Sequence, residues 1–322
     1  MFTSYSVAIR TLGTAGEKYH KTLLSISQQS IQPTNIYVYI PYGYDLPEYT
    51  IGREIYVRCQ KGMIAQRALD FDEIKDEWIL FLDDDIYLPE DYMQRAISIV
   101  NNTNADMLTA NFYQEEKAKI AKKITMFFHS VLPMCSTKWA YRVSRSGRFK
   151  YNIKPQSDVL LTQTGPGACM LCRKSSYLAS KFYEEKWMDD FGYALGDDQL
   201  FHYKMYLLGT KEYIWNNSGA IHLDAGKANR KFDTNSMRKA SAVLCLVWLR
   251  SIYQAHVGQY LNKCLDIISF AFSVVLRLIY SITFMFRGYY DAPLAIIKGI
   301  NDGVRYSKKS SFSSLPNFRK TH

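Results

Sequence analysis

The sequence predicts an α/β protein with a mostly parallel sheet flanked by helices, followed by a C-terminal amphipathic helical tail. Two observations predict the sheet. Strand-like and helix-like segments alternate with short connections over the first 110 residues, and the apolar run from Trp78 to Leu82 ends in three aspartates. Such alternation is typical of a parallel sheet covered by helices. A third observation predicts the tail, since residues 264–286 carry only two charges.

Each element follows from its local pattern. Short apolar runs rich in β-branched and aromatic residues predict strands, and apolar residues every three or four positions predict helices. In the helix predicted at 18–29, Leu23, Leu24 and Ile26 are expected to face inward. The predicted strands are 6–10, 36–40, 54–58, 78–82, 106–111, 168–172, 212–215 and 220–223, and the predicted helices are 18–29, 64–74, 92–101, 120–132, 175–182 and 200–208.

Charge divides the chain into regions. Residues 117–154 hold ten Lys or Arg and no acid, and residues 225–322 hold fifteen Lys or Arg against four Asp, so the rest of this +10 chain is acidic. We expect a domain at 1–224 with a basic insertion at about 112–160, a membrane-associating helical region at 225–306, and a disordered Ser-, Lys- and Arg-rich tail at 307–322. Basic appendages on an acidic body favour an anionic membrane surface as partner. No nucleic-acid recognition motif is present, so no nucleic-acid partner is expected.

The cysteines and the N-terminus indicate a reducing compartment. The six cysteines are scattered, which favours free thiols over disulfides. Cys169 and Cys172 form a C-x-x-C without a second pair, so two small apolar residues on a buried strand are favoured over a zinc site. No N-terminal targeting segment is visible, and we expect the protein to stay on the cytoplasmic side. A homo-oligomer is compatible with the sequence.

The run 264–286 is expected to lie at the cytoplasmic face of the plasma membrane, as a peripheral or monotopic attachment. Its polar and apolar residues separate onto opposite sides of a helix, which is the pattern of an interfacial helix. A buried helix covering the body and a true membrane span remain as alternatives. The polar side carries Asp266, Ser269, Ser273, Arg277, Tyr280, Ser281 and Arg287, and the apolar side carries Ile267, Phe270, Phe272, Val274, Leu278, Ile282 and Met285.

The three adjacent aspartates, Asp83, Asp84 and Asp85, predict a metal-assisted phosphate site. They follow a strand directly, and ligands of open α/β sheets bind at the carboxyl ends of strands. Adjacent carboxylates repel one another unless they stay hydrated or a cation neutralises them. Hard divalent cations such as Mg²⁺ and Mn²⁺ prefer oxygen ligands. A solvated acidic turn is the alternative interpretation of this segment.

A second acidic cluster, Gly196-Asp197-Asp198-Gln199, opens a predicted helix about 110 residues later. Helix capping explains one carboxylate in a first turn. Two carboxylates after a glycine-containing approach indicate a positioned general base.

These motifs, in this order, resemble the family 2 glycosyltransferases, which have the GT-A fold, over about residues 4–224. The likeness includes the Asp83-Asp84-Asp85 and Gly-Asp-Asp-Gln-Leu motifs. Its other parts are Arg10-Thr11, the helix ending near Gln28-Gln29, Lys61-Gly62 with Gln66-Arg67, the strand Gly-Pro-Gly-Ala-Cys-Met-Leu-Cys-Arg from Gly165, and a strand ending at His222. The segment 293–305 also resembles the membrane-associating tail of bacterial members that build surface polysaccharides.

The resemblance implies a Rossmann-like, metal-dependent, inverting enzyme that moves a sugar from a nucleotide-sugar donor to a glycan or lipid-linked sugar acceptor. Asp85, with Asp83 and His222, would contact Mn²⁺ or Mg²⁺, and Asp198 would be the base, with Asp197 in place of the family's usual Glu. The donor would be bound by Thr11, Lys61, Arg67, Asp83 and Asp84, and Gly165 and Gly167 would line the acceptor cleft.

One departure leaves the donor nucleotide open. The family's usual Asp pair after the second strand is replaced by Pro41-Tyr42-Gly43, so Asp45 or Tyr42 would have to contact the base.

Three other functions are weaker. A nucleotidyltransferase would need a phosphate loop that the segment from Arg10 to Gly16 imitates poorly. An aspartate-based phosphatase would need Thr or Val where Tyr87 stands. A non-catalytic membrane scaffold with a transferase-like fold does not account for two intact acidic motifs.

Overall fold

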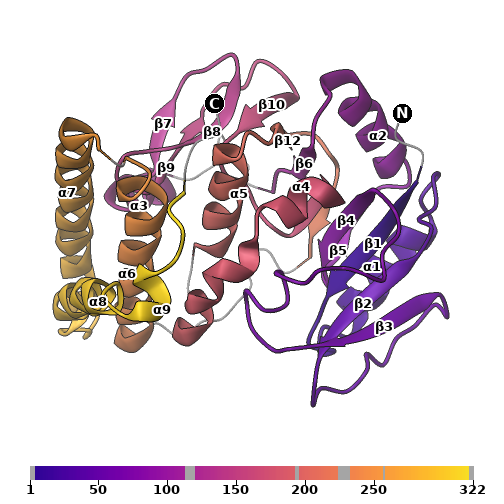
Figure 1. Ribbon diagram of the computed structural model, residues 1–322, viewed down its shortest axis with the longest axis horizontal. Coiled ribbons are helices and arrows are strands. Elements are labelled where there is room, and N and C mark those ends of the chain that lie inside the picture. The colour runs from indigo at the N-terminus through magenta and orange to yellow at the C-terminus, as the bar shows by residue number, and fades with distance from the viewer. Residues whose placement is uncertain (1–3, 113–119, 193–195, 224–232, 257, 319–322) are drawn as a thin grey trace.

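The computed structural model describes residues 4–112, 120–192, 196–223, 233–256 and 258–318. In this part of the chain, one large mixed sheet has helices on both faces, and a small two-stranded sheet, β13-β5, lies beside it (Figure 1). The large sheet has the strand order β3-β2-β1-β4-β11-β6-β12-β10-β8-β9-β7. The strands are β1 (Tyr5–Arg10), β2 (Ile36–Pro41), β3 (Glu54–Cys59), β4 (Trp78–Asp83), β5 (Ile86–Tyr87), β6 (Met107–Ala110), β7 (Leu132–Met134), β8 (Trp139–Val143), β9 (Phe149–Asn152), β10 (Val159–Thr162), β11 (Cys169–Arg173), β12 (Glu212–Trp215) and β13 (Ile221–His222).

Helices lie between the strands and then form the C-terminal region. The predicted α/β class, with a mostly parallel sheet and a helical C-terminal region, is confirmed. The helical elements are α1 (Glu17–Ser27), α2 (Tyr92–Thr103), α3 (Ile120–Phe128), α4 (Lys174–Ala179), η2 (Phe182–Phe191), α5 (Asp197–Leu207), α6 (Thr234–Trp248), η3 (Leu249–Tyr253), α7 (Tyr260–Met285), α8 (Ala292–Tyr306) and α9 (Ser310–Ser313).

The strand register brings distant segments to one edge of the sheet. Strands β3, β2, β1 and β4 are parallel, and Arg10 at the end of β1 pairs with Asp83 at the end of β4. Strand β11 runs antiparallel to β4, with Cys169 opposite Leu82. Because of this direction, the glycine segment before β11 reaches the same edge as the aspartates after β4.

Two apolar cores lie on the two faces of this sheet. One packs α1 and α2 against β1, β2 and β4, with Leu23, Ile26 and Met93 fully buried. The other packs α5 and α6 on the opposite face. Alternation along β1 explains the division, since Val7 and Ile9 face the first core and Ala8 faces the second. Leu24 was predicted to face inward, but it is 38% exposed.

The helix predicted at 64–74 is wrong. This segment forms consecutive turns, although Ile64, Phe71 and Ile74 are buried as its apolar spacing indicates. Phe71 has a φ of 53°, which a right-handed helix cannot contain. The helix predicted at 120–132 ends at Phe128, and Ser130 with a φ of 57° follows.

The chain after residue 233 packs on the body. Val243 and Leu246 of α6 share one core with Leu200 of α5, and Phe312 of α9 is 1% exposed in the same core. The disorder predicted for 307–322 is therefore wrong for 307–318, because apolar residues anchor this segment. Residues 319–322, like Lys117 and Lys119 of the basic insertion, lie outside the described residues.

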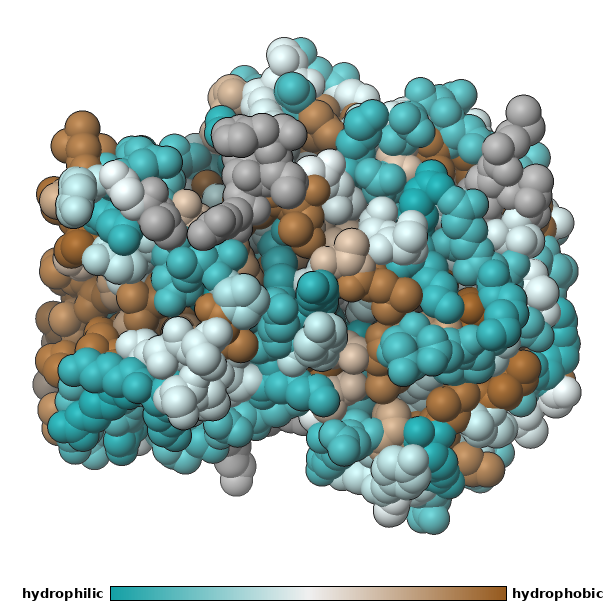
Figure 2. Space-filling view, viewed as in Figure 1, coloured by the Kyte–Doolittle hydropathy of each residue, from teal (hydrophilic) through white to brown (hydrophobic). Residues whose placement is uncertain are grey.

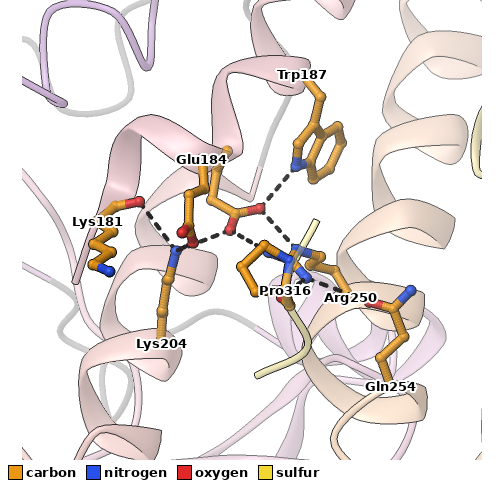
Figure 3. Close-up of polar contacts among 8 residues, drawn as sticks. Lys181, Glu184, Trp187, Lys204, Arg250, Gln254 and Pro316 are labelled. Carbon is orange, nitrogen blue, oxygen red and sulfur yellow. Dashed lines mark hydrogen bonds and ion pairs between the residues drawn. The ribbon is translucent and has the colours of Figure 1, made fainter. Parts of the chain in front are cut away.

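A buried ionic cluster ties this C-terminal part to the body (Figure 3). Glu185 of η2 and Arg250 of η3 are both fully buried and form two hydrogen bonds of 3.0 and 3.1 Å. Lys204 of α5 adds a bond of 3.1 Å to Glu185, and Arg250 donates to the carbonyl of Pro316. Burial opposes the charge of Glu185, but Arg250 outweighs it and lowers the pKa of this carboxyl.

Helix α7 is oriented with its polar side toward the protein. Asp266 and Ser281 are fully buried, and Arg277 is nearly so, whereas Phe272 and Ile268 are more than 60% exposed. Apolar side chains consequently gather over α7, at the left of Figure 2. A window of this helix has a mean hydropathy of 2.0 and is only 28% buried. The buried-helix alternative therefore does not fit.

Candidate active site

A cavity of about 670 Å³ lies at the edge of the sheet where β1 and β4 end. Both predicted acidic clusters open into it, and its lining comes from five separate stretches of the chain. The lining residues are Arg10, Thr11, Leu12, Thr14, Ala15, Lys18, Gly62, Met63, Gln66, Arg67, Asp83, Asp84, Asp85, Asp197, Asp198 and His222.

The first cluster is held by the end of β1. The Arg10 guanidinium lies 2.6 Å from Asp83 Oδ1, and the Thr11 hydroxyl donates to Asp84. Burial and the charges of Asp83 and Asp85 raise the pKa of Asp84 to about 6, although the bond from Thr11 opposes this. Asp84 therefore serves mainly as an acceptor for Thr11, while the Asp83 side chain is 36% exposed toward the cavity.

Asp85 and His222 are the pair with the chemistry of a metal site. His222 Nε2 lies 3.1 Å from Asp85 Oδ2, and β13 and β5 pair directly beside them. Among the described residues, no group of three or more His, Cys, Asp or Glu is arranged to hold a metal. A carboxylate and an imidazole can hold Mn²⁺ or Mg²⁺ when a diphosphate supplies further oxygens, as such cations are commonly bound.

The second cluster opens α5 and is paired with Arg67. This guanidinium is 8% exposed, forms an ion pair with Asp198, and lies 3.4 Å from Asp197. Burial alone would raise the pKa of Asp198, but Arg67, His202 and the backbone N–H of Gly167 lower it. Burial and the charge of Asp198 instead raise the pKa of Asp197 to about 6. Asp198 thus stays ionised to a lower pH than Asp197.

A turn at 62–67 positions Arg67. The Asp189 carboxylate accepts hydrogen bonds from the backbone N–H groups of Ile64, at 2.8 Å, and Ala65, at 3.1 Å. A Cβ at Gly62 would come within 2.5 Å of the same carboxylate, so only glycine fits there. These contacts fix the start of the segment, whereas the positive φ of Phe71 prevents the predicted helix from continuing.

The glycine segment before β11 lies against α5. A Cβ at Gly167 would collide with both Asp198 and Arg67, and Arg10 donates to the Gly167 carbonyl at 3.2 Å. A Cβ at Gly165 would come within 2.8 Å of Ile214 and 3.5 Å of His202. Gly167 therefore borders the second cluster and Gly165 lies near His202, and neither glycine is among the residues that line the cavity.

Most of the other predicted site residues line the cavity, and Lys61 does not. Thr11, Arg67 and His222 line the cavity, together with all five aspartates. Lys61 does not line it, because its ammonium contacts the Tyr44 hydroxyl and lies 4.9 Å from the Tyr44 ring. Cys169 and Cys172 are buried free thiols on β11, as predicted.

Three features of the site were not predicted from the sequence: an ion-pair partner, two cavity residues and one distant contact. Arg10 was noted as part of a motif but not as the partner of Asp83, and Gln66 and Lys18 were not identified as cavity residues. An arginine one residue before Thr11, at a strand end, was the available signal for Arg10. The contact of Asp189 with residues 64 and 65 spans more than 120 positions and leaves no local pattern.

Comparisons with known proteins give a distant likeness of fold. No family model matches the sequence, and no curated protein matches it. A solved structure of GalNAc-T7 with UDP, GalNAc and Mn²⁺ is similar, with a TM-score of 0.47 and 10% sequence identity, over 83% of this chain and 55% of that chain. The chain thus spans about half the length of that structure. At this distance the function has to be argued from the residues of the site.

Proposed function

We propose that the chain is a metal-dependent, inverting glycosyltransferase of the GT-A type, which moves a sugar from a nucleotide-sugar donor to a hydroxyl of a glycan or lipid-linked acceptor. The observation that carries the proposal is that two acidic clusters, about 110 residues apart, meet in one cavity. One cluster has a carboxylate and an imidazole that can hold a cation together with a diphosphate, and the other has an aspartate kept ionised beside an arginine.

The first cluster would bind the donor. Asp85 and His222 would hold Mn²⁺ or Mg²⁺, which when bound neutralises the charge of the departing diphosphate. Asp83, partly exposed and paired with Arg10, faces the cavity where the sugar nucleotide would lie. Thr11 and Asp84 hold this edge of β1 and β4 in place by their hydrogen bond.

The second cluster would activate the acceptor. The Asp198 carboxylate takes the proton of the acceptor hydroxyl as its oxygen bonds to the anomeric carbon from the face opposite the diphosphate. The bond between that carbon and the diphosphate oxygen breaks, and the diphosphate leaves with the electron pair. A single displacement of this kind inverts the anomeric configuration. The absence of a side chain at Gly167 leaves the space that Asp198 and Arg67 occupy beside it.

A donor screen tests this function. The full chain is incubated with Mn²⁺, a panel of sugar nucleotides and membrane-extracted acceptors, and products are identified by mass, with Asp198→Asn as the inactive control. The expected result is one product whose mass exceeds the acceptor by one sugar residue, formed with one nucleoside diphosphate. If calorimetry shows that no sugar nucleotide binds with or without metal, the proposal is wrong and the scaffold interpretation is favoured.

We further propose that the exposed apolar face of α7 rests on an anionic membrane surface on the cytoplasmic side. Three helices contribute to this apolar face: α7 with Ile268 and Phe272, α8 with Ile297, and α3 with Ile124, each about half exposed or more. An exposed continuous apolar surface is rare in soluble proteins unless another surface covers it. The exposed basic residues on or beside these helices suit anionic headgroups: Lys122, Lys123, Arg287, Lys298, Arg305, Lys308 and Lys309.

Substitutions on this face test the attachment better than deletion of the helices, because α6 and α9 belong to the body's core. The double variant Ile268→Glu with Phe272→Glu should no longer float with vesicles that contain anionic lipid, since each glutamate opposes insertion. The control Ile55→Glu changes an exposed residue on β3, at the far side of the molecule, and should float like the wild type (Figure 1). Undiminished flotation of the double variant would contradict the proposed face.

A further inference from the structure

A buried ionic pair lies beneath the second acidic cluster. His202 of α5 and Glu212 of β12 are both fully buried, and His202 Nδ1 lies 2.8 Å from Glu212 Oε2. Within the described residues, the other two polar atoms of the pair, His202 Nε2 and Glu212 Oε1, have no hydrogen-bond partner. Burying such a pair costs free energy that apolar residues would not cost.

The position of the pair links it to the base. His202 follows Asp198 by four residues on α5, so the two side chains are neighbours on one face of the helix. The charge of His202 contributes to the lowered pKa of Asp198, after burial and Arg67. Burial raises the pKa of Glu212 to about 7, and the hydrogen bond with His202 opposes this rise.

The same pair supports the glycine segment 165–167. The His202 ring lies 3.5 Å from the point where a Gly165 Cβ would stand, with Ile214 on the other side at 2.8 Å. Two residues later, Gly167 packs on Asp198 and Arg67. The segment therefore lies against α5 at two residues, His202 and Asp198. Glu212 fixes the orientation of the His202 ring.

We propose that His202, oriented by Glu212, is a positioning residue of the transfer reaction, which sets the segment 165–167 over Asp198 and aligns the acceptor hydroxyl with that carboxylate. The proposal rests on the proposed role of Asp198 as base. Because His202 is buried behind Asp198 and does not line the cavity, we expect its loss to act through Asp198 on the use of the acceptor and to leave donor binding intact.

Steady-state kinetics on the full chain test the proposal. His202→Leu should lower kcat about 10- to 100-fold and raise the KM for the acceptor, with the donor KM within about twofold of the wild type. In Glu212→Gln, the amide oxygen can still accept a hydrogen bond from His202 Nδ1, so this variant should retain most of the wild-type kcat. The matched control is His256→Gln, which removes a His–carboxylate pair with Asp266 (2.6 Å) remote from the cavity, and it should leave kcat unchanged.

A spectroscopic measurement separates positioning from a structural role. In protein labelled with ¹⁵N-histidine, the His202 signal, assigned by its loss in His202→Leu, should shift in Asp198→Asn because the neighbouring charge is removed. A fall in thermal stability of His202→Leu with kcat per folded protein unchanged would overturn the proposal, and so would a changed donor KM alone. If the wild type transfers no sugar, the proposed function fails. An unchanged His202 signal in Asp198→Asn overturns the positioning role only.

Discussion

The two acidic clusters contain the same side chain in opposite surroundings. Asp83 and Asp85 stand at the end of a strand, Asp83 partly exposed and Asp85 nearly buried, and their partners are single cationic or imidazole groups on other strands. Asp197 and Asp198 open a helix, and one nearly buried arginine faces both of them. The first cluster thus has a separate partner for each of these two carboxylates, whereas in the second cluster both carboxylates share a single arginine.

This difference explains how one residue type can serve two tasks. Carboxylates that are to share a cation with a diphosphate must remain accessible and need not be strongly polarised. A carboxylate that is to accept a proton near pH 7 must be ionised despite burial, which needs a fixed positive charge nearby. Four predictions test the division, in order of expected effect.

The largest effect is expected for Asp198→Asn. An amide cannot accept the proton of the acceptor, so transfer should fall by about 10³-fold or more, within the range for loss of a general base. Donor binding by calorimetry should change little. Asp91→Asn, which alters only an exposed pair with Arg95, is the control and should keep full activity. Retention of most activity by Asp198→Asn would assign the base elsewhere.

Asp85→Asn should act through the metal. We expect the Mn²⁺ concentration for half-maximal transfer to rise about 10- to 100-fold, the usual cost of disturbing a metal site, while the acceptor KM stays constant. Activity measured against Mn²⁺ concentration gives this value directly. An unchanged metal curve would place the cation away from His222 and Asp85.

Arg67→Gln should shift the pH profile. Without the guanidinium, the pKa of Asp198 rises toward the value that burial alone would give, so more of the base is protonated at low pH. The acid limb of kcat/KM should move to higher pH by about one unit, which is about a tenfold loss on that limb. Arg238→Gln breaks an exposed pair with Asp302 and serves as control. A limb that stays in place would show that Arg67 does not govern the base.

The last prediction concerns stability, not activity, and Asp197. The pKa of Asp197 is raised to about 6 in the fold, above its unfolded value near 4, so the wild type is most stable below that value and loses stability as the pH rises through 6. Asp197→Asn lacks this loss. When the pH is raised from 4.5 to 7.5, the free energy of unfolding of Asp197→Asn minus that of the wild type should therefore increase by about 1–3 kcal/mol, measured by urea denaturation. An equal difference at both pH values would contradict the raised pKa.

Local patterns predicted most of the body of the fold. Strands β1, β2, β3 and β4 begin and end within one residue of their predicted bounds, because each is a short run rich in apolar, aromatic and β-branched residues. The segment 64–74 was missed for a tertiary reason. Phe71 packs its ring against Phe81 and Tyr177 with a φ of 53°, so the chain turns where its apolar spacing predicted a helix. Likewise, Lys61 contacts Tyr44 and does not line the cavity, and no sequence motif predicts this contact between loops.

The sequence by itself determined that one strand ends in Asp83, Asp84 and Asp85 and that a helix starts at Asp197 and Asp198. It also determined that α7 has a polar and an apolar side. These properties depend on neighbours along the chain. Only the tertiary structure decided that Arg67 pairs with Asp198, that His202 meets Glu212, and that the polar side of α7 faces the protein. Such contacts depend on which surfaces meet in space, and burial, which sets their electrostatic strength, exists only once the chain is folded.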